Sequence, residues 1–128
     1  MKKLIFLLLA VILLTACGQT EEKAQEAVYV NITAQEAKEI MDTQEGYIIL
    51  DVRTQDEYDQ GHIPGAILIP DTEIKARAEE VLTDKDQLIL VYCRSGRRSK
   101  LASEILVELG YTNIREFGGI IDWPYETE

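Results

Sequence analysis

The chain has 128 residues, with 13 Lys and Arg against 23 Asp and Glu and a formal net charge of −10 at pH 7. A protein this acidic is not expected to bind nucleic acid or an anionic membrane surface through its overall charge. Its length suits one domain with its own core and is too short for two domains of ordinary size.

The N-terminal segment differs from the rest of the chain and predicts export. Lys2 and Lys3 precede an unbroken apolar run over residues 4–14, and small residues and a cysteine follow it. A helix that crosses a membrane needs about 20 apolar residues. Because this run is much shorter, we interpret residues 1–16 as a signal peptide that is removed.

The ending Leu14-Thr15-Ala16-Cys17 resembles the lipobox of bacterial lipoproteins. The resemblance implies that Cys17 becomes the first residue of the mature chain and carries lipid on its sulfur. We therefore expect residues 17–28 to be a lipidated anchor and polar spacer, and the protein to lie on the extracytoplasmic face of a bacterial cell membrane. An ordinary signal peptide with a cysteine near its cleavage site is the alternative.

Removal of residues 1–16 takes away two lysines and no acidic residue, so 112 residues with a formal charge of −12 remain. Once Cys17 carries lipid, Cys93 is the only thiol left and no internal disulfide can form. An exported chain with a single free thiol suggests that the thiol has a chemical role.

The first half of residues 29–128, which we expect to form the folded domain, alternates strand and helix patterns. A short strand is predicted over 28–32, and the capping-box pattern Thr33-Ala34-Gln35-Glu36 opens a helix that runs to about Met41. The apolar run 47–52 is typical of a strand buried on both faces. A second short helix is predicted from Thr54, and a strand at 67–69.

The second half repeats this alternation. An amphipathic stretch covers 74–82, and the apolar run 87–92 predicts a central strand. A helix is predicted from near Ser99, with Gly110 at its C-terminal cap and a last strand over 114–117. We expect one helical face to hold Leu101, Ile105, Leu106 and Leu109. The fold class is therefore α/β, with a mostly parallel five-stranded sheet and helices on both faces.

Cys93 follows the central strand and precedes a helix, at the sheet edge where open parallel sheets bind ligands. A helix N-terminus offers free backbone N–H groups and partial positive charge there, and Gly96 permits the tight curvature of an anion cradle. Nearby cations and N–H donors lower a thiol pKa, so we expect a reactive thiolate. The alternative is an inert buried cysteine beside a solvated basic loop. The four cations after Cys93 are Arg94, Arg97, Arg98 and Lys100.

Three segments together resemble the rhodanese family: 51–66, with Asp51-Val52-Arg53 and Gly61-His62-Ile63-Pro64-Gly65-Ala66; the loop 93–98; and 117–123, with Phe117-Gly118-Gly119 and Trp123. The resemblance spans nearly all of residues 29–125. It implies a rhodanese-like fold and a cycle in which Cys93 takes sulfane sulfur from a donor, holds it as a persulfide and passes it to a nucleophile. Leu68 departs from the family, which often has asparagine there.

The resemblance also assigns roles around Cys93. The loop with its following serine is expected to bind the substrate through Arg94, Ser95, Gly96, Arg97, Arg98 and Ser99. The arginines favour a thiosulfate-like donor over mercaptopyruvate, and the acceptor is a thiol or cyanide. Neither a cofactor nor a metal is implied, because one cysteine and one histidine supply no zinc ligand set. We expect a monomer.

Asp51 and Arg53 end the other buried strand and are expected at the same sheet edge as Cys93. They support the loop in one interpretation and form a surface ion pair in the other. His62 is interpreted as a turn residue that ties backbone together, against the alternative of a Cys-His catalytic pair. Trp123 is assigned to packing.

Two other functions compete with sulfur transfer. Phosphatases and arsenate reductases of this fold have a cysteine loop one residue longer, and here Arg98 comes one residue too early for that spacing. The second is a non-catalytic, membrane-anchored module that binds or senses sulfane sulfur or a partner protein. The intact Cys93 loop argues against it.

Overall fold

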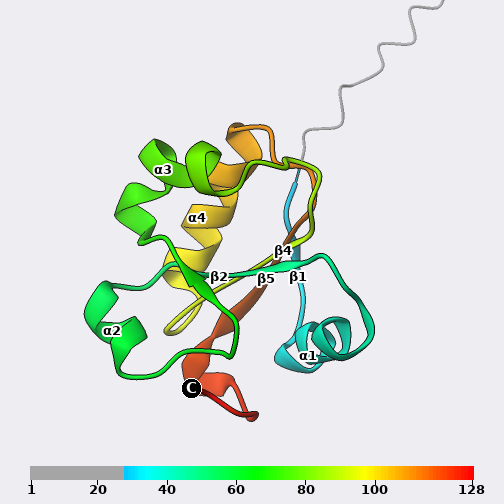
Figure 1. The fold of residues 1–128 in the computed structure, drawn as a ribbon, viewed down its shortest axis with the longest axis vertical. Coiled ribbons are helices and arrows are strands. Elements are labelled where there is room, and N and C mark those ends of the chain that lie inside the picture. Colours follow the sequence, from blue (N-terminus) through cyan, green and yellow to red (C-terminus); the bar gives the residue numbers. More distant parts are fainter. Residues whose placement is uncertain (1–27) are drawn as a thin grey trace, which may run out of the picture.

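The computed structural model describes residues 28–128. The predicted signal peptide, Cys17 and nearly all of the spacer lie outside the described residues. Within 28–128 the chain forms one five-stranded sheet in which every pairing is parallel and the strand order is β1-β5-β4-β2-β3. The predicted α/β fold with a parallel five-stranded sheet is confirmed (Figure 1).

The helices and strands alternate along the chain as their sequence patterns predict. The strands are β1 (Val30–Asn31), β2 (Ile48–Asp51), β3 (Ile67–Leu68), β4 (Ile89–Cys93) and β5 (Ile114–Gly119). The helices are α1 (Ala34–Thr43), α2 (Gln55–Asp59), α3 (Ile74–Val81) and α4 (Arg97–Glu108), with short 3₁₀ turns at Asp71–Glu73 and Ile120–Asp122.

Reciprocal capping boxes start the first two helices. Thr33 caps α1 and Thr54 caps α2, and in each the side chain three residues later returns a hydrogen bond to the cap residue. Gly110, with a φ of +97°, follows the end of α4, and the N–H of Tyr111 reaches back to the Leu106 carbonyl. This 6→1 bond is the glycine C-cap motif that the sequence predicted.

Two apolar layers cover the two faces of the sheet. Helices α3 and α4 lie on one face, and α1 lies on the other with the C-terminal segment (Figure 1). Along β4 the side chains alternate: Val91 and Cys93 pack in the α3–α4 layer, while Leu90 and Tyr92 pack in the α1 layer. All five β4 residues are buried, which identifies this strand as the centre of the fold.

Two predictions about element limits and the placement of one leucine are wrong in detail. The first strand pairs over only two residues, because it is an exposed edge strand with a single neighbour. Helix α4 begins at Arg97, before the predicted Ser99, because Gly96 already turns the chain with a φ of +105°. On α4, Leu101 is 48% exposed and lies outside the buried face, whereas Leu106 is fully buried and Ile105 and Leu109 pack against the core as predicted. That face holds Ser99, Ala102, Ser103 and Leu106.

Candidate active site

Cys93 is the last residue of β4 and lies at the carboxyl edge of the sheet. Its residue exposure is 1%, and Val91 and Ala102 belong to the same apolar cluster. Among residues 28–128 it is the only cysteine, and its thiol is free. The strand thus delivers the sulfur to the position where parallel α/β sheets place ligands.

Hydrogen bonds around the sulfur favour its ionised form. Burial alone raises the pKa of the Cys93 thiol, but hydrogen bonds from Ser99 and from the backbone N–H groups of Gly96 and Ser95 outweigh burial, so that the pKa lies below its usual range. The Gly96 N–H lies 3.0 Å from Sγ. Since N–H groups at the start of a helix point at the sulfur, the loop is built to hold negative charge there.

The loop rests directly on the backbone of β5. A Cβ atom added to Gly119 would lie 1.9 Å from the Arg94 carbonyl oxygen, far inside any contact distance. The Ile121 N–H also donates to that carbonyl at 3.2 Å. Gly119 is therefore required by close approach, whereas Gly96 is required by its positive φ. The sequence placed these glycines in family motifs without showing that they touch the loop.

The arginines of the loop divide into two kinds. Arg94 and Arg97 are exposed. Arg98 instead forms a two-pronged ion pair with Glu57 of α2, at 2.7 Å and 2.9 Å. The Arg98 hydrogen bonds lower the pKa of Glu57 to about 2. Arg98 thus fastens the loop to α2, and sequence reasoning did not assign this partner although Glu57 lies within the segment 51–66 that resembles the family.

Glu116 of β5 is a buried acid that lies under the loop and was missed from the sequence. Its exposure is 2%, and its Oε1 accepts hydrogen bonds from Ser99 Oγ at 2.6 Å and from the Gly118 N–H at 2.9 Å. The strand alternation gave a signal, since Glu116 is two residues after the buried Ile114 and points to the same face.

Asp51 and Arg53 form a buried brace beside the Cys93 strand, so the surface ion pair considered from the sequence is wrong. Arg53 donates to both Asp51 oxygens and, at 2.7 Å, to the Gly61 carbonyl. The Tyr92 hydroxyl donates to Asp51 Oδ2 at 2.7 Å and accepts from the Ile63 N–H. Burial and the Asp51 hydrogen bond raise the pKa of Tyr92. The brace ties the end of β2 to the end of β4 and to the turn at 61–63.

His62 and Trp123 take the packing and bridging positions predicted for them. The His62 ring stacks on Tyr58 with centroids 3.8 Å apart, and its two nitrogens lie 3.0 Å from the Tyr58 carbonyl and 3.2 Å from Glu128 Oε1. Trp123 packs against Phe117 and Tyr125. Neither side chain is among the hydrogen-bonding partners of Cys93.

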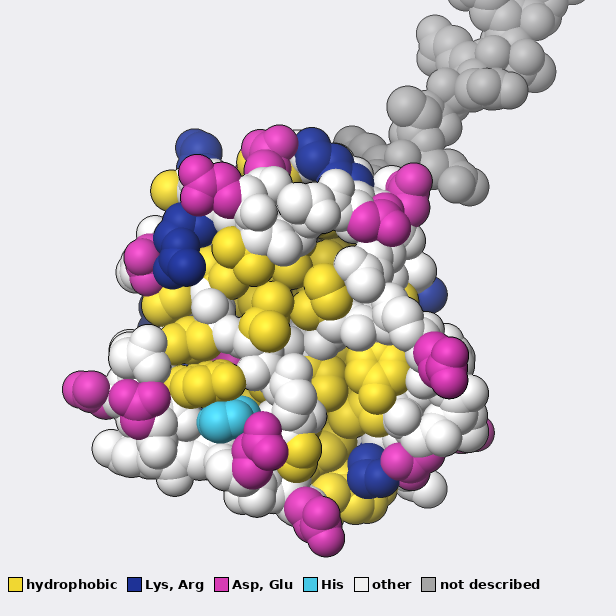
Figure 2. Space-filling view, viewed as in Figure 1, with side chains coloured by type: hydrophobic (Ala, Val, Ile, Leu, Met, Phe, Trp, Pro, Cys, Tyr) yellow, Lys and Arg dark blue, Asp and Glu magenta, His cyan; other side chains and the backbone are white. Residues whose placement is uncertain are grey.

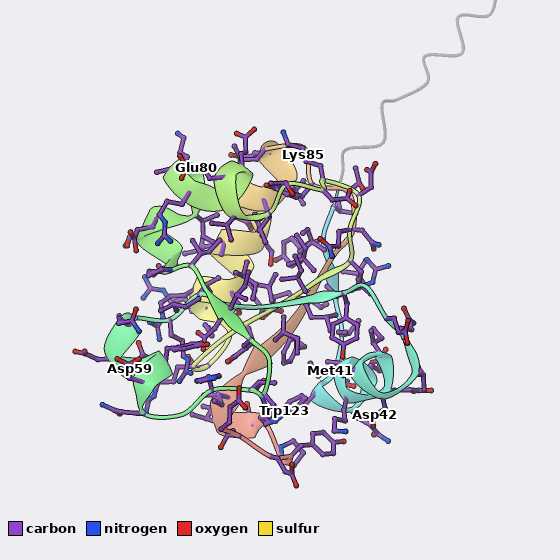
Figure 3. The ribbon with its side chains drawn as sticks, in the orientation of Figure 1. Met41, Asp42, Asp59, Glu80, Lys85 and Trp123 are labelled. Atoms are coloured by element: carbon purple, nitrogen blue, oxygen red, sulfur yellow. The ribbon has the colours of Figure 1, made fainter. Side chains whose placement is uncertain are left out.

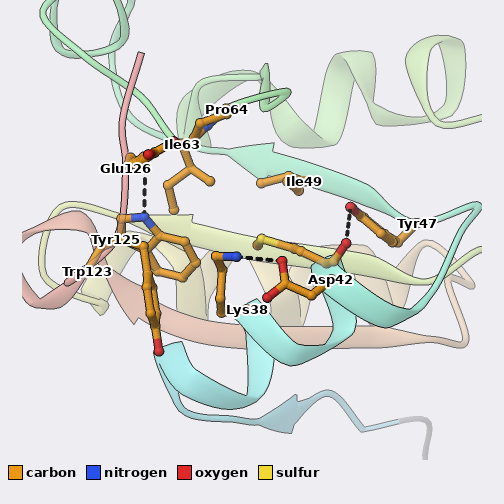
Figure 4. A pocket seen from close by; sticks show the side chains of 10 residues that line it. Lys38, Asp42, Tyr47, Ile49, Ile63, Pro64, Trp123, Tyr125 and Glu126 are labelled. Atoms are coloured by element: carbon orange, nitrogen blue, oxygen red, sulfur yellow. Dashed lines mark hydrogen bonds and ion pairs between the residues drawn. The ribbon is translucent and has the colours of Figure 1, made fainter.

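A cavity of about 530 Å³ lies between α1 and the C-terminal segment, and no residue of the Cys93 loop lines it. Figure 3 shows Trp123 beside Met41 and Asp42 of α1. In the close view of Figure 4 the Lys38–Asp42 ion pair stands at this cavity, and the Trp123 indole donates to the Glu126 carbonyl. The polar groups of Lys38, Asp42, Trp123 and Glu126 at this cavity thus form ion pairs or hydrogen bonds with one another.

The surface of residues 28–128, their helices and their possible metal ligands bear on the functions considered from the sequence. Acidic side chains spread around the margin of the face shown in Figure 2, while apolar side chains gather nearer its centre. Within residues 28–128, none of the helices has the length and apolar character to span a bilayer. The same part of the chain contains no cluster of three or more side chains suited to hold a metal ion.

Comparison with known proteins gives a consistent result. The model of the rhodanese-like domain family matches residues 33–124. The thiosulfate sulfurtransferase PspE of Escherichia coli is 45% identical over 73 residues, which are 57% of this chain and 70% of PspE. A protein named sulfurtransferase from Allochromatium vinosum is 40% identical over 80 residues, covering 62% of this chain and 73% of that protein.

Solved structures show the same likeness. A structure described as rhodanese with anions from E. coli is 40% identical, with a TM-score of 0.60, and covers 64% of this chain and 96% of that chain. The solution structure of a rhodanese-like domain from Anabaena is 29% identical, with a TM-score of 0.71 and 77% of each chain covered. The likeness therefore extends over most of the described fold.

Proposed function

This chain is a member of the rhodanese-like domain family, and we propose that it is a sulfurtransferase that carries sulfane sulfur as a persulfide on Cys93. The arrangement of hydrogen-bond donors around the sulfur carries the proposal. A thiol whose pKa is lowered by N–H donors at the start of a helix, despite burial, is suited to nucleophilic attack. Relatives named as thiosulfate sulfurtransferases support this assignment.

In the first half of the cycle, the Cys93 thiolate attacks the outer sulfur of a thiosulfate-like donor. A bond forms between Sγ and that sulfur, the donor's sulfur–sulfur bond breaks, and sulfite leaves with the electron pair. Arg94 and Arg97, as exposed cations of the loop, are assigned to the anionic donor and leaving group. Arg98 is committed to Glu57 and keeps the loop in place.

In the second half, an acceptor nucleophile, a thiol or cyanide, attacks the outer sulfur of the persulfide. The bond between the two sulfurs breaks and its electron pair returns to Cys93 as a thiolate. The N–H groups of Ser95, Gly96 and Ser99 that stabilise the thiolate also stabilise this leaving group. The near-complete burial of Cys93 favours a small donor over a bulky one.

Thiocyanate formation from thiosulfate and cyanide tests the activity, with Cys93→Ser as the variant. We expect turnover in the wild type, and a loss of at least about 10³-fold in the variant, because a serine hydroxyl cannot carry sulfane sulfur. Circular dichroism verifies that the variant is folded. A wild type that accepts sulfur but never passes it on would instead indicate a binding or sensing module.

We also propose that Cys17 anchors the protein to the extracytoplasmic face of a bacterial membrane through lipid. The support is the lipobox-like ending of the N-terminal segment. Expression of the full chain in a bacterium with labelled palmitate tests the proposal. Label should enter the wild type and sediment with membranes, whereas Cys17→Ser should be unlabelled; an unlabelled wild type would contradict it.

A further inference from the structure

The cavity between α1 and the C-terminal segment is separate from the Cys93 loop and has an apolar base. Its volume of about 530 Å³ lies within the range of about 300–1,000 Å³ that is typical of ligand pockets. Ile49 and Ile63 are buried at its base, and Met41 and Trp123 are half-buried beside them (Figure 4). A hollow of this size and lining has room for a large apolar side chain.

The cavity continues into a second, smaller hollow along α1. Lys38, Asp42 and Tyr125 line both of them. The second hollow has a volume of about 380 Å³ and adds Glu39 to the lining. Because the two hollows share three residues, they form one elongated groove, which we call the α1 groove. Its shape suits an extended chain segment that places one side chain in the cavity.

The rim of the α1 groove is acidic. Glu39, Asp42 and Glu126 are exposed acids of its lining. The single cation in that lining is Lys38, which is ion-paired with Asp42 and lies 5.6 Å from the centroid of the Tyr125 ring. Among residues 28–128, no ion pair joins Glu39 or Glu126 to a cation. The rim therefore offers carboxylates to a positively charged occupant.

The charge of the whole chain disfavours two other occupants of the groove. Residues 1–27 contain three lysines and three glutamates, so the full formal charge of −10 lies on residues 28–128. A second copy of the chain and an anionic lipid surface would each bring further negative charge to an acidic rim. A partner with positive charge is the complementary one.

We propose that the α1 groove binds a basic segment of a partner protein, with one large apolar side chain in the cavity and lysine or arginine side chains against the acidic rim. This interaction goes beyond the proposed sulfur transfer and does not depend on it. The C-terminal segment connects the groove to the active site, because the Ile121 N–H donates to the Arg94 carbonyl and Trp123 lines the cavity. A bound partner would thus lie beside the segment that contacts the Cys93 loop.

Trp123 is the single tryptophan of the chain, so its fluorescence reports on occupancy of the cavity. The probe is the peptide acetyl-KKLKK-amide, added to the full chain, with acetyl-KKSKK-amide and acetyl-EELEE-amide as matched peptides. We expect a saturable change with the first peptide, and an affinity weaker by about tenfold or more when serine replaces its leucine. The acidic peptide should give no saturable change, and added salt should weaken binding of the basic one.

Glu126→Lys tests the acidic rim at an exposed position whose backbone carbonyl, rather than its side chain, accepts from Trp123. We expect the affinity for acetyl-KKLKK-amide to fall by about fivefold or more. Glu80→Lys is the matched control, because it makes the same charge change on α3, and Figure 3 shows Glu80 far from Trp123. It should weaken binding by less than about twofold. Cys93→Ser should bind the peptide as the wild type does.

Several results would overturn the proposal. They are the absence of a saturable response to acetyl-KKLKK-amide, an equal response to the acidic peptide, and equal weakening in Glu126→Lys and Glu80→Lys. A Trp123 signal that changes with protein concentration alone would assign the groove to a second copy of the chain. A signal that shifts with phosphatidylglycerol vesicles would assign it to lipid, and either result contradicts a basic protein segment as the occupant.

Discussion

The ends of β2 and β4 lie side by side at one edge of the sheet, where Asp51 is in register with Tyr92. The buried polar groups at these two ends are arranged differently. After β2, both carboxylate oxygens of Asp51 and the Nε and Nη2 atoms of Arg53 are hydrogen-bonded inside the protein. After β4, N–H donors converge on a single sulfur. The first arrangement holds the fold together, and the second leaves donors available for an anion.

This contrast shows why charge alone does not mark the reactive position. Asp51 and Arg53 are formally charged and deeply buried, yet their charges cancel within the pair. Cys93 is formally neutral in the sequence, but the loop favours its anion. Substitutions at the end of β2 should therefore mainly lower the free energy of unfolding, whereas substitutions around the Cys93 loop should mainly lower activity. The sizes of these effects test whether the two strand ends differ in this way.

The largest effect is expected for Gly119→Ala, which presses a methyl group into the Arg94 carbonyl. The loop must shift, and a displacement near 1 Å can cost about 100-fold in rate. Thiocyanate formation should fall by at least about this factor. Gly46→Ala is the control for a methyl group added to a glycine without a steric clash: Gly46, unlike Gly119, has a positive φ, but no atom lies within 4 Å of an added Cβ. Equal losses of activity in both variants would show that the close contact between Gly119 and the Cys93 loop is not needed for activity.

Arg53→Met should chiefly lower stability. It leaves the Asp51 carboxylate buried without its cation, and breaking a buried pair in this way costs about 3–5 kcal/mol of unfolding free energy. Urea unfolding measures this loss, and Cys93 alkylation by the folded fraction should stay within about twofold of the wild type. If the rate of Cys93 alkylation in the folded fraction also falls strongly, the Asp51–Arg53 pair is needed for the reactivity of Cys93 as well as for stability.

Glu57→Gln should have the smallest effect, about 1 kcal/mol, because the Glu57–Arg98 pair is partly exposed. The folded-state pKa of Glu57 is depressed from 4.5 to about 2. Its contribution to stability is therefore complete above about pH 4.5 and is lost as the pH falls toward 2. Unfolding free energies measured between pH 6 and about 3 should fall less steeply for the variant. Parallel curves would show that this ion pair contributes nothing.

The sequence predicted the elements of the fold well, since strands such as Ile89–Cys93 are continuous apolar runs and both capping boxes are local patterns. It also located the Cys93 loop between strand and helix. The limits of β1 and the placement of Leu101 on the buried face of α4 were wrong, because edge exposure and the burial of small residues such as Ser99 and Ser103 depend on tertiary packing.

Long-range partners were the main part that the sequence did not predict. The Glu57–Arg98 pair joins residues 41 apart and the Ser99–Glu116 contact joins residues 17 apart. No local pattern specifies which acid meets which donor across such distances. Only the alternation of β5 could have indicated that Glu116 points inward. The contact of Gly119 with the loop likewise depends on how β4 and β5 end together.

The most direct test of the central claim is the intact mass of residues 18–128 before thiosulfate, after thiosulfate and after subsequent cyanide, with Cys93→Ser alongside. We predict a gain equal to one sulfur atom only where Cys93 is present, and its loss as thiocyanate when cyanide is added. If no adduct forms with thiosulfate, mercaptopyruvate or a polysulfide, the account of Cys93 as a sulfur carrier is contradicted.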